Sequence, residues 1–199
     1  MKLLFASNNR HKTEEIKNII FENFNDKIEI VSPSSILINF NEPFENGLTF
    51  KENSLIKAKE YYKLSYLTCI ADDSGLEIDS INGMPGVHSA RFAGEPSDDA
   101  QNRTKVLEMM KNIEDEKRTA RFKTVLCYFN KDTELYFEGI CNGKITEYEM
   151  GTNGFGYDSI FIPEGYDITF AQMVQSKKNK ISHRSIALDK FMKYLDSKI

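Results

Sequence analysis

The order of apolar strands and amphipathic helices constrains the fold of this chain most. Residues 3–6 form a short apolar run that predicts a buried strand. After a polar loop, residues 13–24 carry apolar side chains at helical spacing, and residues 50–64 do the same before a predicted strand over 66–71. Strands that alternate with helices are typical of α/β proteins.

The second half of the chain adds strands that follow one another directly. Residues 120–130 and 134–141 predict adjacent strands of a meander, and crossovers combined with a meander predict an α/β fold with a mixed sheet. We expect one domain over residues 1–199. The other predicted elements are a breaker-rich loop at 83–86, a helix at 98–112, an extension of the sheet at 144–149, a strand at 159–162 and a final helix from Ser182 to Tyr194.

Composition limits the classes of partner. The chain has 199 residues, of which 40% are hydrophobic, enough for one core or for two lobes that share a cleft. Its net charge of -4 provides no overall field for a nucleic-acid backbone. Polar residues follow the first apolar run at once, and no stretch of about 18 apolar residues occurs. We therefore expect a cytoplasmic protein that binds neither nucleic acid nor membrane, with any phosphate site being local.

The first polar loop is a candidate phosphate site. It lies between a strand and a helix N-terminus, where unpaired N–H groups and the helix dipole attract anions. Arg10 and Lys12 support this, because a cation near the positive end of a helix is disfavoured by about 0.3–1 kcal/mol unless an anion is also present. A solvated loop whose cations extend into water is the alternative. The loop consists of Ser7, Asn8, Asn9, Arg10, His11 and Lys12.

Paired carboxylates make a candidate metal site. Asp72 and Asp73 follow an apolar strand, and we expect a tight turn there that directs both side chains into one cleft. A divalent cation would offset their mutual repulsion, so the pair suits Mg²⁺ binding and activation of a water molecule. Glu45 would add a third carboxylate, and Lys57 lies on the following helix. A solvated turn and ordinary surface charges are the alternatives.

A glycine-rich segment is a candidate base site. Phe155 and Tyr157 stand between glycines, which would let a ring approach a flat ligand such as a purine. Aromatic side chains tucked into the core of a hairpin loop are the alternative. Lys178, His183 and Arg184 gather at another predicted helix start, where cations again favour an acceptor-rich ligand.

Taken together, these segments resemble the inosine triphosphate pyrophosphatase family, also called the non-standard purine NTP pyrophosphatase or Ham1-like family. The resemblance covers nearly the whole chain in consistent order. It departs from the family pattern at Gln172, where an acidic residue is common, and at Ser159, where proline is common. The motifs that carry it are Ser7 to Lys12, Glu45 to Phe50, Ala71 to Leu76, Phe155 to Asp158 and Ser182 to Arg184.

The resemblance implies a fold and an activity. The implied fold is an elongated mixed β-sheet flanked by helices, with two lobes and a central substrate cleft, assembled as a homodimer. The implied enzyme is a Mg²⁺-dependent hydrolase that cleanses the nucleotide pool of ITP, dITP and XTP. Water would attack the α phosphorus, and the products would be a nucleoside monophosphate and pyrophosphate.

The resemblance also implies residue roles. Asp73 would be the general base and, with Glu45 and nearby Asp72, would serve Mg²⁺. The phosphates would be contacted by Ser7, Asn8, Asn9, Arg10, His11, Lys12 and Lys57. The substrate, chiefly its base, would be held by Ser74, Phe155, Gly156, Tyr157, Asp158, Lys178, His183 and Arg184.

Hydrogen-bond polarity predicts which bases are accepted. Arg184 offers only donors, which suits the 6-oxo acceptor of hypoxanthine or xanthine and opposes the 6-amino donor of adenine. Two alternative functions stay open at the level of sequence. One is a purine nucleotide-binding protein that does not hydrolyse its ligand, and the other is a pyrophosphatase for another modified nucleotide.

Overall fold

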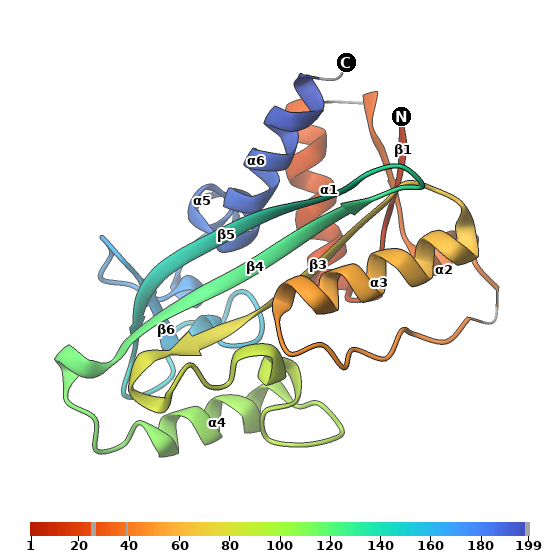
Figure 1. The fold of residues 1–199 in the computed structure, drawn as a ribbon. Coiled ribbons are helices and arrows are strands. Elements are labelled where there is room, and N and C mark those ends of the chain that lie inside the picture. Colours follow the sequence, from red (N-terminus) through yellow and green to blue (C-terminus); the bar gives the residue numbers. More distant parts are fainter. Residues whose placement is uncertain (25–26, 39, 198–199) are drawn as a thin grey trace. The chain divides into compact units, whose positions relative to one another are not determined.

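A mixed six-stranded sheet runs through the computed structural model, which describes residues 1–24, 27–38 and 40–197. The strand order is β2-β1-β3-β4-β5-β6 (Figure 1). β1 pairs in parallel with β2 and β3, whereas β6 is antiparallel to β5. This confirms the predicted α/β class with a mixed sheet. The strands are β1 Lys2–Phe5, β2 Glu29–Val31, β3 Cys69–Ile78, β4 Thr119–Phe129, β5 Glu134–Ile145 and β6 Phe161–Pro163.

Helices fill most of the connections. Within the described ranges, none of them combines the length and apolar character that crossing a membrane requires. The α-helices are α1 Arg10–Phe24, α2 Pro33–Ile36, α3 Phe50–Ser65, α4 Asp99–Met109, α5 Gln175–Ile181 and α6 His183–Asp196. The 3-10 turns are η2 Asp79–Ile81, η3 Gly86–Arg91, η4 Asp115–Lys117, η5 Asp158–Ile160 and η6 Phe170–Gln172.

The chain forms two compact units that interleave along the sequence. Unit 1 consists of Met1–Asp73, Thr124–Gly139 and Ser185–Ile199, and unit 2 consists of Ser74–Lys123 and Ile140–Arg184. The boundaries fall inside β3, β4, β5 and α6. The two lobes that the family resemblance implies correspond to these units.

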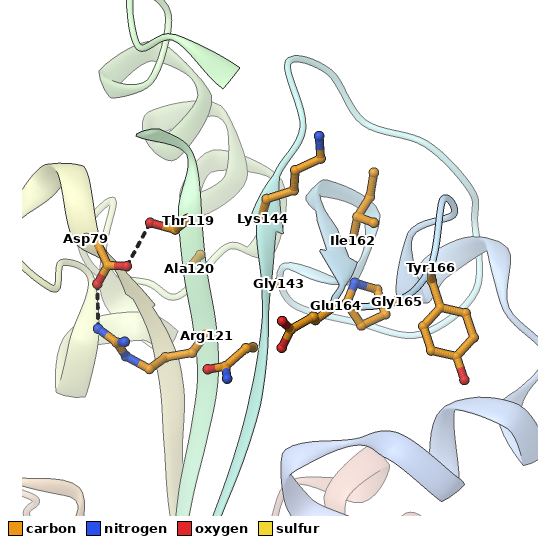
Figure 2. A pocket seen from close by; sticks show the side chains of 12 residues that line it. Asp79, Thr119, Ala120, Arg121, Gly143, Lys144, Ile162, Glu164, Gly165 and Tyr166 are labelled. Atoms are coloured by element: carbon orange, nitrogen blue, oxygen red, sulfur yellow. Dashed lines mark hydrogen bonds and ion pairs between the residues drawn. The ribbon is translucent and has the colours of Figure 1, made fainter. Parts of the chain in front are cut away.

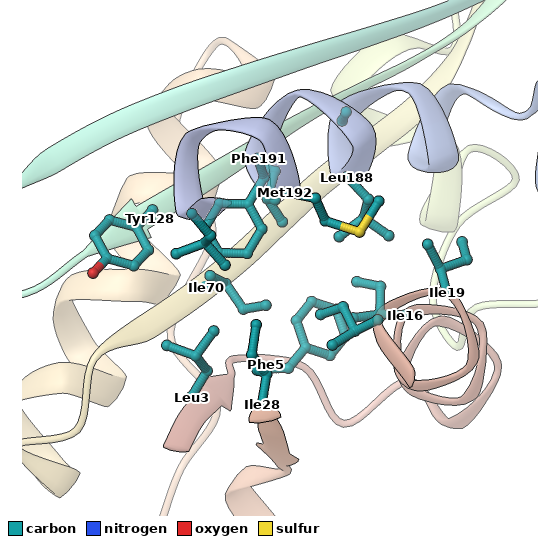
Figure 3. Packing of buried hydrophobic residues seen from close by; sticks show 14 of the residues in the cluster. Leu3, Phe5, Ile16, Ile19, Ile28, Ile70, Tyr128, Leu188, Phe191 and Met192 are labelled. Carbon is teal, nitrogen blue, oxygen red and sulfur yellow. The ribbon is translucent and has the colours of Figure 1, made fainter. Parts of the chain in front are cut away.

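Unit 1 buries both faces of its strands. Leu3 and Phe5 of β1 pack with α1 and α6 (Figure 3), whereas the alternating residues Leu4 and Ala6 pack with α3. In β3, Ile70 lies on the α1 side. Successive side chains of a strand point to opposite faces, so this alternation assigns every later β3 position in unit 1 to one helix or the other.

Unit 2 has an aromatic core of its own. Phe122 of β4 contacts Phe161 edge to face at 4.7 Å and stacks with Phe170 at 6.0 Å between ring centroids. Val106 and Met110 add the apolar side of α4. Aromatic pairs at such distances stabilise a core beyond the burial of their surface area, so this core provides a rigid base for the loops of unit 2.

Arg118 connects separate segments around that core by hydrogen bonds, and its side chain is only 2% exposed. Its guanidinium donates to the carbonyl oxygens of Ile145 at 2.8 Å, Met110 at 2.7 Å and Thr146 at 2.5 Å. Hydrogen bonds to a charged group contribute about 1.5–3 kcal/mol each, and buried carbonyls without donors are costly. The side chain therefore stabilises unit 2 without being available to a ligand.

Arg118→Met should lower the melting temperature by on the order of 10 °C, because three buried carbonyls lose their donors at once. The exposed Lys117→Met is the matched control and should change the melting temperature little. Thermal unfolding followed by circular dichroism checks this. Equal melting temperatures for the two variants would contradict the structural role of Arg118.

The expected turn at Asp72 and Asp73 was wrong. β3 begins at Cys69 and continues through both aspartates to Ile78. It starts later than predicted because Tyr66 closes α3 in a left-handed conformation, with φ at 56°. It continues further because Lys12 and the buried Lys57 neutralise the two buried carboxylates, so the strand does not have to reach solvent at this point.

The bounds of other helices and strands also differ from the predicted ones. α1 begins at Arg10, three residues before the predicted helix, so its first turn includes part of the polar loop. β5 is one strand to Ile145, so the extension of the sheet expected at 144–149 is seen for Lys144 and Ile145 only. At 159–162 the 3-10 turn η5 precedes β6. The helix at α3 agrees with its prediction to within one residue.

Candidate functional site

The predicted site residues form one group in each unit. In unit 1, the first group is arranged around α3, which carries Lys57. Its start is defined by a capping box, in which the Thr49 hydroxyl accepts from the Glu52 N–H at 3.1 Å and the Glu52 carboxylate accepts from the Thr49 N–H at 3.2 Å. Asn53 and Lys57, one turn apart, are both buried.

Lys57 brings two carboxylates together. Its Nζ lies 2.9 Å from Glu45 Oε2 and 3.6 Å from Asp73 Oδ1. Asp73 lies on the face of β3 that packs with α3, as the alternation from Ile70 requires. The predicted meeting of Glu45, Asp73 and Lys57 is therefore seen within unit 1.

Protonation equilibria in this group are shifted. Burial raises the pKa of Asp73 above its ordinary value, against the opposing charges of Lys57 and Lys12. Burial acts to lower the pKa of Lys57, but the charges of Asp73, Glu45 and Asp72 together raise it. A buried carboxylate with a raised pKa beside a lysine is a common feature of sites that accept protons.

Asp72 faces the other way. Its Oδ2 lies 3.1 Å from Lys12 Nζ, and Asp72 is almost completely buried. Lys12 comes from the first turn of α1, on the opposite face of β3 from α3. Asp72 thus holds Lys12, whereas Asp73 lies with Lys57 and Glu45.

The loop before α1 makes several contacts of its own. Asn9 Oδ1 accepts from the Lys12 N–H at 3.1 Å, and Ser7 Oγ accepts from the Asn9 N–H at 3.1 Å. Asn8 donates to Glu42 Oε1 at 2.7 Å. Arg10 is exposed and pairs with Glu14 at 2.8 Å. The prediction for His11 falls on a side chain outside the described part of the structure.

A divalent cation fits this group together with a phosphate. In the described ranges, no three His, Cys, Asp or Glu side chains gather closely enough to form a complete metal site. Mg²⁺ usually binds one or two carboxylates and takes its other ligands from water and substrate phosphates. Glu45 and Asp73 already share a cation, the Lys57 ammonium, and they provide the hard oxygen ligands that Mg²⁺ prefers.

The group in unit 2 is built on a tight loop. Asp158 Oδ2 accepts from the Phe155 N–H at 2.9 Å and from Lys178 Nζ at 2.5 Å. Gly154 has φ at +76°, and a Cβ there would come within 2.0 Å of Asp158 Oδ2. Glycine thus lets this carboxylate close the loop. Lys178 Nζ lies 4.9 Å from the centroid of the half-buried Phe155 ring.

Arg184 lies beside the same ring. Its Cζ is 5.9 Å from the Phe155 centroid, and its Nη2 donates to Ser74 Oγ at 3.4 Å. His183 is buried and stacks on Phe122 at 4.9 Å between centroids. Within unit 2 the structure therefore brings together the predicted residues Ser74, Phe155 and Arg184.

Tyr157 is a core residue. It is buried in the apolar cluster of unit 2, and its hydroxyl donates to the Ser89 carbonyl at 2.7 Å. Burial raises the pKa of its phenol. Of the two aromatic side chains in this loop, Tyr157 is packed in the core, whereas Phe155 is only half-buried.

Three residues that the sequence interpretation missed support the site. Asn53 donates to Asp73 Oδ2 at 3.1 Å. Asp99 and Arg103 of α4 bind the N–H and the carbonyl of Gly156, at 2.8 and 2.9 Å. The spacing of Asn53 one helical turn before Lys57 was the available signal, because such residues share a helix face. Nothing local marks Asp99 and Arg103.

The two departures from the family pattern have structural partners. Gln172 Oε1 accepts from the Thr169 N–H at 2.9 Å and completes a capping box at η6. Ser159 Oγ donates to Glu149 Oε2 at 2.9 Å. Both substitutions are therefore accommodated by local hydrogen bonds.

A separate cavity in unit 2 has a different lining. It encloses about 450 Å³ and is bordered by β4, β5, β6 and the residues that follow β6 (Figure 2). Asp79 there accepts hydrogen bonds from Thr119 and Arg121, and Lys144 pairs with Asp115 at 2.8 Å. None of the predicted site residues is among those that line it.

A buried carboxylate and a buried ammonium group with shifted pKa values, such as those of Asp73 and Lys57, are typical of enzymes that act on charged substrates. Comparison with known proteins then identifies the family. A sequence model of the Ham1 family matches residues 3–194. The chain belongs to the Ham1 family, as the motifs of its sequence indicated.

Relatives match over the whole length. The dITP/XTP pyrophosphatase of Christiangramia forsetii is 47% identical over 98% of this chain and 99% of its own, and that of Oceanobacillus iheyensis is 42% identical over 98% of each. The solved Ham1 protein of Staphylococcus aureus is 36% identical with a TM-score of 0.89, covering 100% of both chains. A HAM1 protein from Coxiella burnetii gives 34% identity and 0.88 over 99% of both.

Proposed function

We propose that this protein hydrolyses the non-standard purine nucleoside triphosphates ITP, dITP and XTP to the monophosphate and pyrophosphate, and so cleanses the nucleotide pool. The observation that carries the proposal is that the partly exposed Glu45 and the buried Asp73 meet at the buried Lys57. Full-length similarity to proteins named dITP/XTP pyrophosphatases supports the substrate class.

The group in unit 1 takes the polyphosphate. The N-terminus of α1, with residues 7–12, and the ammonium groups of Lys12 and Lys57 attract the phosphate oxygens. Asp72 holds Lys12 in place through their buried pair. Mg²⁺, held by Glu45 and Asp73, supplies charge neutralisation when it is bound.

Asp73 accepts the proton. It takes a proton from the water that attacks the α phosphorus, and the bond from that phosphorus to the bridging oxygen breaks with pyrophosphate as the leaving group. Burial raises the pKa of the Asp73 carboxyl above its ordinary value, which makes it a better proton acceptor than an exposed aspartate. Lys57 stabilises the negative charge that develops on the phosphate oxygens.

The group in unit 2 takes the base. The Phe155 ring stacks on the purine, and Asp158 with Lys178 holds the loop that carries this ring. Arg184 donates to the 6-oxo group, while Ser74 contacts both Arg184 and the substrate. His183, which stacks on Phe122 at the start of α6, completes the recognition of the base.

The setting of the enzyme follows from the resemblance to its family. We propose that Mg²⁺ is its metal, that the chain works as a homodimer and as one functional domain, and that it acts in the cytoplasm on free nucleotides. The net charge of -4 agrees with an enzyme that has no nucleic-acid partner.

A nucleotide panel tests the function. Purified protein is incubated with Mg²⁺ and ITP, dITP, XTP, ATP, GTP or dTTP, and pyrophosphate and orthophosphate are measured separately. We expect pyrophosphate from the first three, with kcat/KM for ATP lower by about 100-fold or more, because adenine leaves the Arg184 donors unmatched. Binding of ITP without pyrophosphate release would favour a non-hydrolytic protein. Preference for another base would indicate a different modified nucleotide.

A further inference from the structure

The side chain of Asn53 connects two segments of unit 1 that carry the proposed Mg²⁺ ligands Glu45 and Asp73. Its Nδ2 donates to Asp73 Oδ2 at 3.1 Å, and its Oδ1 accepts from the Gly47 N–H at 2.8 Å. Gly47 lies two residues after Glu45. The residue is only 1% exposed, so both ends of the amide are used inside the protein. One side chain therefore connects β3 to the segment that carries Glu45.

Only one orientation of this amide satisfies both partners. A reversed amide would direct its carbonyl oxygen at the Asp73 carboxylate and its NH₂ at the Gly47 N–H, with acceptor facing acceptor and donor facing donor. The approach is also close, since a Cβ at Gly47 would lie 2.6 Å from Asn53 Oδ1 and 2.7 Å from Glu52 Cβ. The segment after Glu45 is thus held against α3 at a defined distance.

Lys57, on the next turn of α3, connects the Glu45 and Asp73 carboxylates directly by charge. The Lys57 ammonium would also bind the phosphate, so its position changes when the substrate binds. The Asn53 amide is buried and neutral, so its position does not depend on the substrate. Mg²⁺ requires near-ideal octahedral geometry at about 2.0–2.1 Å, so the separation of its carboxylate ligands has to be set in advance. Groups that orient metal ligands typically change metal affinity or activity by about 10- to 100-fold when they are removed.

We infer that Asn53 is a positioning residue that sets the separation of the Glu45 and Asp73 carboxylates for one divalent cation. This inference rests on the proposed function of those carboxylates. Asn53 contacts no reacting atom and acts through Asp73 and the backbone of Gly47. The competing explanation is that Asn53 only stabilises the start of α3.

Two variants separate these explanations. Asn53→Leu removes both hydrogen bonds and keeps the branching at Cγ. Asn53→Gln keeps both the donor and the acceptor but lengthens the side chain by one methylene group, so it changes the separation that the amide sets without adding a charge, and it is the closer mimic if the leucine variant folds poorly. For both we expect the Mg²⁺ concentration at half-maximal rate to rise about tenfold or more, and kcat to fall, while KM for ITP at saturating Mg²⁺ stays within about threefold.

Asn102 provides the matched control. It is also 1% exposed, and its amide accepts from the Ala93 N–H at 2.6 Å and donates to the Ala90 carbonyl at 3.0 Å, both within unit 2. Asn102→Leu should lower the melting temperature and leave the Mg²⁺ requirement unchanged. Melting temperatures of all three variants show how much of any effect is general destabilisation.

Metal binding is also measured without turnover. Mn²⁺ is titrated into each folded protein in the absence of nucleotide and followed by water-proton relaxation, with affinity in the Asn53 variants expected to fall about tenfold or more. Wild-type Mg²⁺ requirement and Mn²⁺ affinity in both Asn53 variants would overturn the inference, even if their stability falls. A wild-type protein that releases no pyrophosphate from ITP would instead refute the proposed function, and the Mn²⁺ titration would still test Asn53.

Discussion

Asp73→Asn should lower the rate of pyrophosphate release from ITP by about 10²- to 10⁴-fold, the range expected when a general base is removed. Asparagine keeps the size of the side chain but cannot accept the proton of the attacking water at neutral pH. It also weakens one of the two carboxylate ligands proposed for Mg²⁺. The measurement is kcat for ITP at saturating Mg²⁺.

The same substitution should leave the protein folded. Because burial raises the pKa of Asp73, its charged form costs folding free energy at neutral pH, and the neutral asparagine removes that cost. Lys57 retains Glu45 at 2.9 Å. We expect a melting temperature no more than about 5 °C below that of the wild type. Asp79→Asn, in the separate cavity of unit 2, is the control and should keep the wild-type rate. A fast Asp73→Asn enzyme would remove Asp73 as the base.

Arg184→Met should lower kcat/KM for ITP by about 10- to 100-fold while changing that for ATP little. The arginine is 2% exposed, and loss of a hydrogen bond from a charged group to the 6-oxo oxygen costs about 1.5–3 kcal/mol. Adenine carries an amino donor at this position and gains nothing from Arg184. The ratio of kcat/KM for ITP to that for ATP measures the effect.

Arg118→Met is the control for that experiment. Both arginines are 2% exposed in unit 2, but Arg118 donates to backbone carbonyls of its own unit. Its replacement should reduce stability and preserve the ITP to ATP ratio. If Arg184→Met leaves the ratio unchanged, or if both variants alter it equally, Arg184 does not recognise the base.

Local sequence signals predicted the helices best. α3 agrees closely because its start depends on Thr49 and Glu52, three residues apart, whose side chains cap each other. α1 was predicted too short, because the apolar residues at helical spacing begin only after the polar loop, whereas the helix itself includes Arg10 and Lys12 in its first turn. Glu14 and Asp72 offset those charges, one from the next turn and one from a distant strand.

The family motifs indicated which residues to examine, and the structure brings Glu45, Lys57 and Asp73 together in unit 1 and Phe155, Arg184 and Ser74 in unit 2. Residues that position the site through the backbone could not be predicted from the sequence. Asp99 and Arg103 act on the backbone of Gly156, and a side chain that binds a distant peptide group leaves no pattern in its own neighbourhood.

The sequence by itself determined the fold class, the family and the identity of the charged residues, because periodicity and ordered motifs are local properties of the chain. Only the tertiary structure decided which partner each aspartate has. Asp72 and Asp73 continue one strand, so their side chains point to opposite faces and meet different lysines, from α1 and from α3. Two adjacent and chemically identical residues acquire different ion-pair partners because the two faces of the sheet are covered by different helices in unit 1.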